Sequence, residues 1–236
     1  KVLLDVTAVN TNKNITVTSA TPALGAADSS TITLTGVGTG AAGTTITSDG
    51  VETFNVVLAG AASGSAVYGN VTLASNELET VNVSGNVAAR LTVDLTGADL
   101  VSQTATFDAS EATAGVTATI TAGGSTKLAV TGGAGNDSFT VGALDKDYTI
   151  TGGDGVDTLV ATASAPGASL AAADYVGVGV SGFEMISAAS AGSVDFRSLP
   201  NNDFIATYGA GTYSKAAAEI ADTLVTSFCI NNTDKA

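Results

Sequence analysis

The chain has 236 residues and a formal net charge of −14, from 22 acidic and 8 basic residues. It contains no His and one Cys, which excludes His-based catalytic relays, internal disulfides and Cys-based zinc sites. With so few Lys and Arg residues to replace counterions on phosphate, the composition also argues against nucleic-acid binding.

Alternating apolar and polar residues dominate the chain and predict short strands with one buried face. Four segments show this period most clearly, at 14–18, 31–35, 90–96 and 116–121. Clusters of Gly, Asn, Asp and Ser separate them, as turns require. An antiparallel sandwich would give the same local pattern, so the alternation alone establishes only an all-β class. No run of about 18 apolar residues is present, so no membrane span is expected.

An internal repeat favours a solenoid over a sandwich. The segment 51–56 (VETFNV) resembles 78–83 (LETVNV) at an offset of 27 residues, and 106–110 (TFDAS) follows after about 26 more. The form returns at 183–187 (FEMIS). This offset predicts one rung of a parallel β-helix, in which Val and Phe stack inward on Val and Phe, while Glu and Asn face outward. Low charge fits this arrangement, because like charges stacked about 4.8 Å apart repel.

The C-terminal region departs from the strand pattern. Residues 214–225 begin with Ser and carry good helix formers, which predicts a short helix. The expected organisation is a β-rich segment at 1–49, solenoid rungs at 50–130, a turn-rich segment at 131–160 and a β-rich region at 161–236. The sequence starts with Lys1 rather than Met, which is expected of a mature form or of a piece of a longer chain.

The turn-rich segment contains two copies of one nonapeptide. The copies at 132–140 (GGAGNDSFT) and 152–160 (GGDGVDTLV) both fit G-G-x-G-x-D-x-U-x, where U is a large apolar residue, and they start twenty residues apart. On these residues the chain resembles the RTX calcium-binding β-roll, a family of secreted bacterial repeat proteins. The eighth positions, Phe139 and Leu159, are expected to point into the core of the roll.

The resemblance implies Ca²⁺ as the cofactor. Ca²⁺ takes six to eight oxygen ligands from carboxylates and carbonyls, and glycine lets the backbone turn its carbonyls inward. In the family an ion lies between turns stacked one coil apart. The metal-binding residues implied here are Gly132, Ala134, Asn136, Asp137, Gly152, Gly153, Asp154, Gly155 and Asp157.

Acidic residues are concentrated in the same stretch. Asp145 and Asp147 lie between the nonapeptides, where only Lys146 compensates them, in a half-coil without G-G-x-G. One edge of the roll is therefore expected to bind the family's ion, and the other edge is not. The alternative is a pair of Gly-rich turns that carry solvated Asp residues, as turn chemistry favours.

The segment from about 50 to 192 also resembles bacterial surface-layer proteins of the RTX type, which Gram-negative type I systems export. The resemblance implies a non-enzymatic structural protein at the outer cell surface, where a calcium-stabilised β-solenoid self-assembles into a two-dimensional lattice. The partner is the chain itself, and cell-surface polysaccharide is a second candidate. The alternatives are a secreted RTX adhesin, a repeat segment of an exoprotein, and the β-roll tail of an RTX enzyme.

Overall fold

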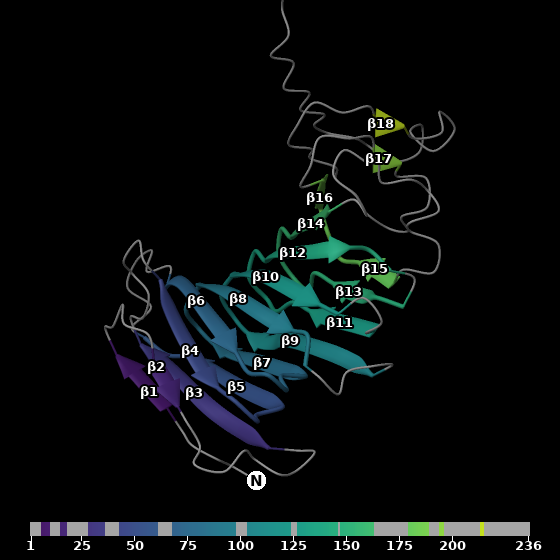
Figure 1. Ribbon diagram of the computed structural model, residues 1–236. Helices are drawn as coiled ribbons and strands as arrows, with labels where there is room; N and C mark the ends of the chain where they lie inside the picture. Colours follow the sequence, from purple (N-terminus) through teal and green to yellow (C-terminus); the bar gives the residue numbers. More distant parts are fainter. Residues whose placement is uncertain are drawn as a thin grey trace, which may run out of the picture.

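The computed structural model contains two parallel β-sheets that wind along one solenoid (Figure 1). It describes residues 28–35, 43–60, 68–97, 103–123, 127–145, 147–162 and 179–188, and short strands at 6–9, 15–17, 194–195 and 213–214. Every strand pairing between successive coils is parallel. The predicted all-β parallel solenoid is confirmed, and the antiparallel sandwich is excluded.

The two sheets contain eight strands each, and the chain alternates between them. We call them the odd and the even sheet after their strand numbers. The odd sheet consists of β1 (Val6–Val9), β3 (Ser29–Thr35), β5 (Thr53–Leu58), β7 (Thr80–Gly85), β9 (Thr104–Ala112), β11 (Lys127–Thr131), β13 (Thr149–Thr151) and β15 (Gly179–Ser181). The even sheet consists of β2 (Ile15–Val17), β4 (Thr44–Ser48), β6 (Tyr68–Ala74), β8 (Ala89–Leu95), β10 (Val116–Ala122), β12 (Ser138–Ala143), β14 (Thr158–Thr162) and β16 (Met185–Ala188). Strands β17 (Val194–Asp195) and β18 (Tyr213–Ser214) form a separate parallel pair.

The predicted repeat is the true spacing between the coils of β5, β7 and β9. Asn55 on β5 pairs with Asn82 on β7, at a separation of 27 residues. On the next coil, Thr80 pairs with Thr106 of β9. Inward positions therefore stack in columns such as Phe54, Val81 and Phe107. The four strands predicted from alternation are also confirmed, with boundaries that shift by one or two residues.

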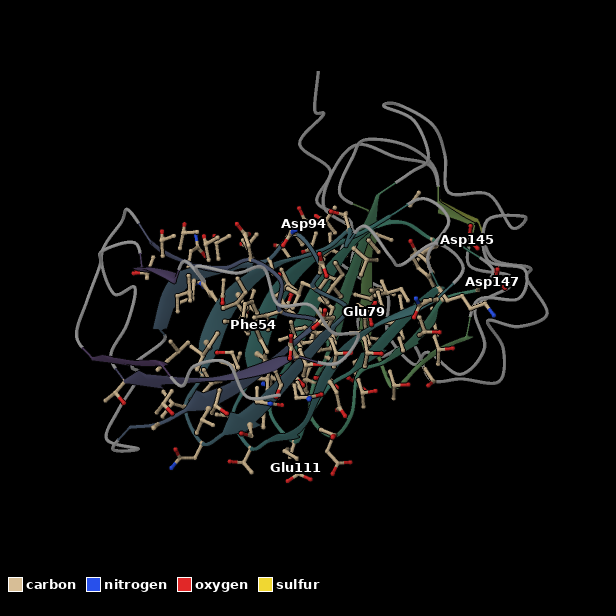
Figure 2. All side chains as sticks on the ribbon, turned by 60° about the horizontal axis from the view of Figure 1, so that its bottom comes forward. Phe54, Glu79, Asp94, Glu111, Asp145 and Asp147 are labelled. Atoms are coloured by element: carbon tan, nitrogen blue, oxygen red, sulfur yellow. The ribbon has the colours of Figure 1, made fainter. Side chains whose placement is uncertain are left out.

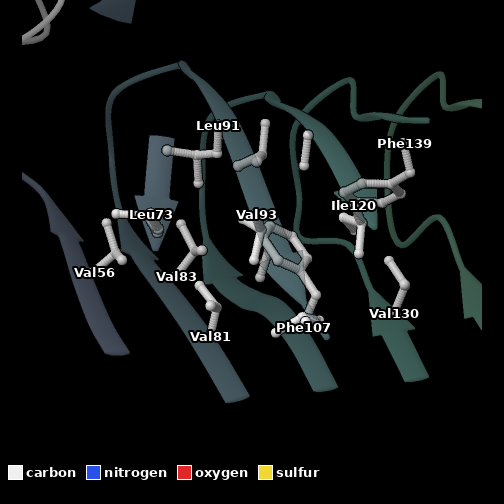
Figure 3. Close-up of a cluster of buried hydrophobic side chains, with 14 of the residues drawn as sticks. Val56, Leu73, Val81, Val83, Leu91, Val93, Phe107, Ile120, Val130 and Phe139 are labelled. Atoms are coloured by element: carbon white, nitrogen blue, oxygen red, sulfur yellow. The ribbon is translucent and has the colours of Figure 1, made fainter. Parts of the chain in front are cut away.

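The interior between the sheets is filled by aliphatic and aromatic side chains (Figure 3). Strand residues alternate between buried and half-buried or exposed positions, so each strand contributes one face to this core. The ring centroids of Phe107 and Phe139 lie 5.8 Å apart, and those of Phe139 and Phe183 lie 6.3 Å apart, both in edge-to-face contact. These rings link the odd sheet, the even sheet and the turn before β16.

One detail of the repeat prediction was wrong. Glu52 was expected to face outward, but only 5% of its surface is exposed. It lies in the turn before β5, where its Oε2 accepts the N–H of Asp28 at 2.7 Å. The segment at 183–187 does not continue the repeat at 51–56 within one sheet, because it leads into β16 of the even sheet. Similar local sequences therefore form turns at opposite edges of the solenoid.

The predicted C-terminal helix falls outside the described residues, apart from Ser214 at the end of β18. Pairing continues across the expected boundaries near 50 and 131, since β3 pairs with β5 and β11 pairs with β13. In the described ranges, no helix is long and apolar enough to cross a membrane.

Candidate metal centre

The solenoid has two edges, and the nonapeptide turns lie on the same one. Residues 132–137 lead from β11 to β12, and residues 152–157 lead from β13 to β14, so both turns pass from the odd to the even sheet. We call this the odd-to-even edge. The turn at 182–184, between β15 and β16, continues the stack on the same edge. Phe139 pairs with Leu159, which places the two nonapeptides in register one coil apart.

Glycine at the first position of each turn lets neighbouring coils touch through their backbones. A Cβ on Gly132 would overlap the carbonyl oxygen of Gly152, and a Cβ on Gly152 would overlap that of Gly182. The same Cβ atoms would lie 2.6 Å from Asp137 Oδ2 and 2.7 Å from Asp157 Oδ2, respectively. The missing side chain of the first glycine therefore leaves a space in each turn. A carboxylate oxygen and a carbonyl oxygen both lie next to this space.

The acidic side chains of this edge form a ladder of hydrogen bonds between successive coils. Asp137 Oδ1 accepts the N–H of Val116, Asp157 Oδ1 accepts the N–H of Asp137, and Glu184 Oε2 accepts the N–H of Asp157. The donor–acceptor distances are 2.7, 2.7 and 2.6 Å, as expected for charge-assisted bonds. Each carboxylate thus binds the backbone of the coil before it.

Asp137 and Asp157 are 1% and 0% exposed, and the pKa of both carboxyl groups is raised. Burial is the main cause of the raised pKa of Asp137, which the N–H groups of Val116 and Gly133 partly oppose. Burial also raises the pKa of Asp157 to about 6. The N–H of Asp137 lowers that pKa, whereas the charges of Asp137, Glu184 and Asp154 raise it.

The predicted ligand residues divide into buried and exposed groups. Gly132, Gly152, Asp137 and Asp157 are buried. The remaining predicted ligands are exposed, namely Ala134, Asn136, Gly153, Asp154 and Gly155. Asn136 Oδ1 accepts the N–H of Val156 at 3.0 Å and so joins the two turns directly.

Asp145 and Asp147 lie at the opposite edge, in the turn from β12 to β13. Both are exposed (Figure 2). Asp145 Oδ1 accepts the N–H of Asp147 at 3.0 Å. The structure therefore separates Asp145 and Asp147 from the nonapeptide carboxylates. They lie in the half-coil without G-G-x-G, as the sequence predicts.

The residues of the odd-to-even edge fit an oxygen-binding cation. Asp157 Oδ2 is buried without a hydrogen-bond partner, although a buried acceptor normally has one. Among the described residues, no group of three His, Cys, Asp or Glu side chains forms a possible metal site. Backbone carbonyls would have to supply most ligands, as they often do for Ca²⁺.

Sequence reasoning missed Glu184 as a member of this edge. It stands 27 residues after Asp157 and holds the equivalent position one coil later, because the next residues, Thr158 and Met185, pair in register. The signal was present in Gly182-Phe183-Glu184, where an acidic residue precedes a strand as Asp157 precedes β14. Only the strand pairing shows that the two positions are equivalent.

Comparison with known proteins gives no family for this chain. No protein-family model, curated protein or solved structure matches it. A functional interpretation therefore depends on the fold and on the geometry of the odd-to-even edge.

Proposed function

We propose that the chain is a structural protein of a bacterial surface layer, a calcium-stabilised solenoid that self-assembles into a two-dimensional lattice. The role is not enzymatic, and the proposed location is the outer surface of a Gram-negative cell after type I secretion. The observation that carries the proposal is the pair of buried carboxylates, Asp137 and Asp157, stacked one coil apart between glycine turns. A divalent cation at this edge would compensate their charge.

The outer face of the even sheet supports the lattice part of the proposal. A column of five threonines runs in register through β4, β6, β8, β10 and β12, and consists of Thr45, Thr72, Thr92, Thr119 and Thr140. These side chains are small and uncharged, and their hydroxyl groups can both donate and accept hydrogen bonds. Such a column permits close approach of a second copy without like charges in contact.

Net charge supplies the link between calcium and assembly. Protomers with a charge of −14 repel one another, and this repulsion opposes side-by-side packing. Monovalent salt screens that repulsion, with a Debye length of about 8 Å at 0.15 M. A structural ion also orders the edge that it binds, which sodium chloride does not do.

Negative-stain electron microscopy of the purified chain tests the proposal. Calcium at about ten times a Kd of 10⁻⁴–10⁻³ M, the range of extracellular modules, is expected to give regular arrays. Chelator with added sodium chloride is expected to give none. Equal assembly in both conditions would reduce calcium to a screening ion. A monomer that stays soluble in calcium and binds glycans would favour the adhesin instead.

A further inference from the structure

The two nonapeptide turns share a sequence pattern but differ in one buried oxygen. Asp137 Oδ2 accepts the N–H of Gly133 at 2.7 Å, so both oxygens of Asp137 have backbone donors. Asp157 Oδ1 accepts the N–H of Asp137, whereas Asp157 Oδ2 has no partner. An unsatisfied buried acceptor loses its hydration without replacement, and a bound ligand would recover that loss.

The backbone of the second glycine also differs between the two turns. Gly153 has a φ of +106°, in the region that favours glycine, and Gly133 is not among the glycines with positive φ. The position equivalent to Gly133 therefore has another backbone conformation in the second turn. No N–H from it reaches Asp157 Oδ2, so this oxygen is left for another partner.

The surroundings of this oxygen are suited to a cation. Asp157 Oδ2 and the carbonyl oxygen of Gly182 both lie beside the Cα of Gly152, in the space that a Cβ there would occupy. The carboxylate of Glu184 lies next to Asp157, because Glu184 Oε2 accepts the N–H of Asp157 at 2.6 Å. The oxygen thus faces a carbonyl group inside a field of negative charge.

We propose that Asp157 Oδ2 anchors a calcium ion on the Gly182–Glu184 side of the second turn, where Gly182 offers a carbonyl and Glu184 offers charge. This inference rests on the proposed function for the identity of the ion. It moves the ion one coil beyond the position implied by the nonapeptides, which would lie between Asp137 and Asp157. Carbonyl and carboxylate ligands in an irregular turn suit Ca²⁺ better than Mg²⁺, which requires near-octahedral geometry.

Calorimetric titration of the full chain with calcium chloride tests this position. Asp157→Asn keeps an oxygen for the N–H of Asp137 but removes the charge, and is expected to raise Kd at least tenfold. Glu184→Gln keeps the acceptor for the N–H of Asp157 and is expected to raise Kd about threefold to tenfold. Asp137→Asn should raise Kd less than Glu184→Gln, because its oxygens already have donors. Asp145→Asn, at the exposed opposite edge, is the matched control and should leave Kd unchanged.

Two outcomes would overturn the proposed position. If Asp137→Asn abolishes binding while Glu184→Gln matches the wild type, the ion lies between the two nonapeptides. If the wild type takes up no calcium at millimolar concentration, Asp157 is a neutral buried acid. Should Asp157→Asn fail to fold, Glu184→Gln against Asp137→Asn still decides between the two positions. Hydrogen exchange of β5–β9 in chelator reports whether each variant is folded.

The titration and the microscopy can fail separately. Calcium binding that depends on Asp157 and Glu184, without any array, would support the site and reject the surface-layer role. Arrays that form with calcium in Asp157→Asn and Glu184→Gln as in the wild type would reject the site as the structural ion of the lattice.

Discussion

The coils at residues 53–95 and those at 127–162 belong to the same two sheets but close their turns differently. In the earlier coils, the paired residues Asn55 and Asn82 are separated by 27 residues, and side chains cap turns at the edge opposite the nonapeptides. Asn76 Oδ1 accepts the N–H of Gly50 at 2.8 Å, and Ser75 Oγ accepts that of Val51 at 3.2 Å. In the later coils, Asp137 and Asp157 hold the same position in two successive turns and are separated by only 20 residues.

The shorter coil has fewer residues with which to fill its interior and edge. At the odd-to-even edge its turns pack backbone against backbone through Gly132 and Gly152, and the carboxylates of Asp137 and Asp157 are buried. The aromatic ring of Phe139 fills the interior between Phe107 and Phe183. The shorter coils thus combine close backbone contact with buried charge at one edge.

The largest expected effect is loss of the ring that fills the short coils. Phe139→Ala should lower the free energy of unfolding by about 4 kcal/mol, through lost burial and the cavity that remains. Val83→Ala, in the longer coils, should lower it by about 2 kcal/mol because fewer atoms are removed. Urea unfolding of both variants measures the difference. Equal losses would mean that the short coils do not depend on the aromatic column.

Backbone contact at the glycine turns gives the next effect. Gly152→Ala places a methyl group against the carbonyl of Gly182, which cannot move as a side chain would, and should lower the free energy of unfolding by about 3 kcal/mol. Gly142→Ala in β12 is the matched control, because a Cβ there meets nothing within 4 Å. Its free energy of unfolding should stay within about 0.5 kcal/mol of the wild type. A tolerated Gly152→Ala in urea unfolding would show that the coils separate easily.

Much of the earlier coils could be predicted from sequence, because their signals are local and repeated. Alternation placed the strands near 31–35 and 116–121, and the similarity of 51–56 to 78–83 placed β5 beside β7. A solenoid repeats one geometry, so similar segments occupy similar positions. The nonapeptide pattern placed both turns for the same reason.

The polar contacts between coils could not be predicted in this way. Glu52 is buried where it accepts the N–H of Asp28 from the preceding coil. The residues next to Glu52 in the sequence do not indicate that this N–H lies nearby. Glu184 joins the carboxylate ladder because β14 and β16 pair across an intervening strand and its turns. The different conformations of Gly133 and Gly153 arise within one shared pattern, so the unpaired oxygen of Asp157 emerges only from the folded chain.

The buried acids predict an unusual pH dependence in calcium-free buffer. The folded-state pKa of Asp157 is about 6, above its ordinary value of 3.8, so the unfolded chain holds fewer protons between these values. This contribution to stability is complete below pH 3.8 and is lost as the pH rises through 6; Asp137 acts in the same direction. The urea midpoint should therefore rise as the pH is lowered from 7 to 5.

Two variants assign this pH dependence to its source. Asp157→Asn cannot titrate and should flatten the curve between pH 7 and 5, whereas Asp145→Asn at the opposite edge should leave the curve as in the wild type. If the two variants give the same curve, the pH dependence does not come from Asp157.

The smallest effect concerns the columns of polar side chains on the outer face of the longer coils. Asn82 Nδ2 donates to Asn55 Oδ1 at 2.9 Å, and Asn82 also pairs in register with Asp108 on β9. Asn82→Asp would place two carboxylates on neighbouring strands, where like charges repel by up to about 1 kcal/mol. Asn55 pairs with Thr31 and Asn82, so Asn55→Asp meets no charged neighbour in its column and is the matched control.

Salt separates this repulsion from loss of the amide hydrogen bond. Asn55→Asp keeps an acceptor for Asn82 Nδ2, whereas Asn82→Asp removes that donor, so loss of the hydrogen bond adds a difference between the variants that salt does not remove. Only Asn82→Asp adds repulsion, which raising the salt concentration from about 0.01 to 1 M should screen as the Debye length falls from about 30 to 3 Å. The difference between the unfolding free energies of the two variants should therefore be largest at low salt and shrink at high salt to the part that the hydrogen bond contributes. A difference that is equally large at low and at high salt would mean that packing or the lost hydrogen bond, rather than charge, keeps acidic residues out of this column.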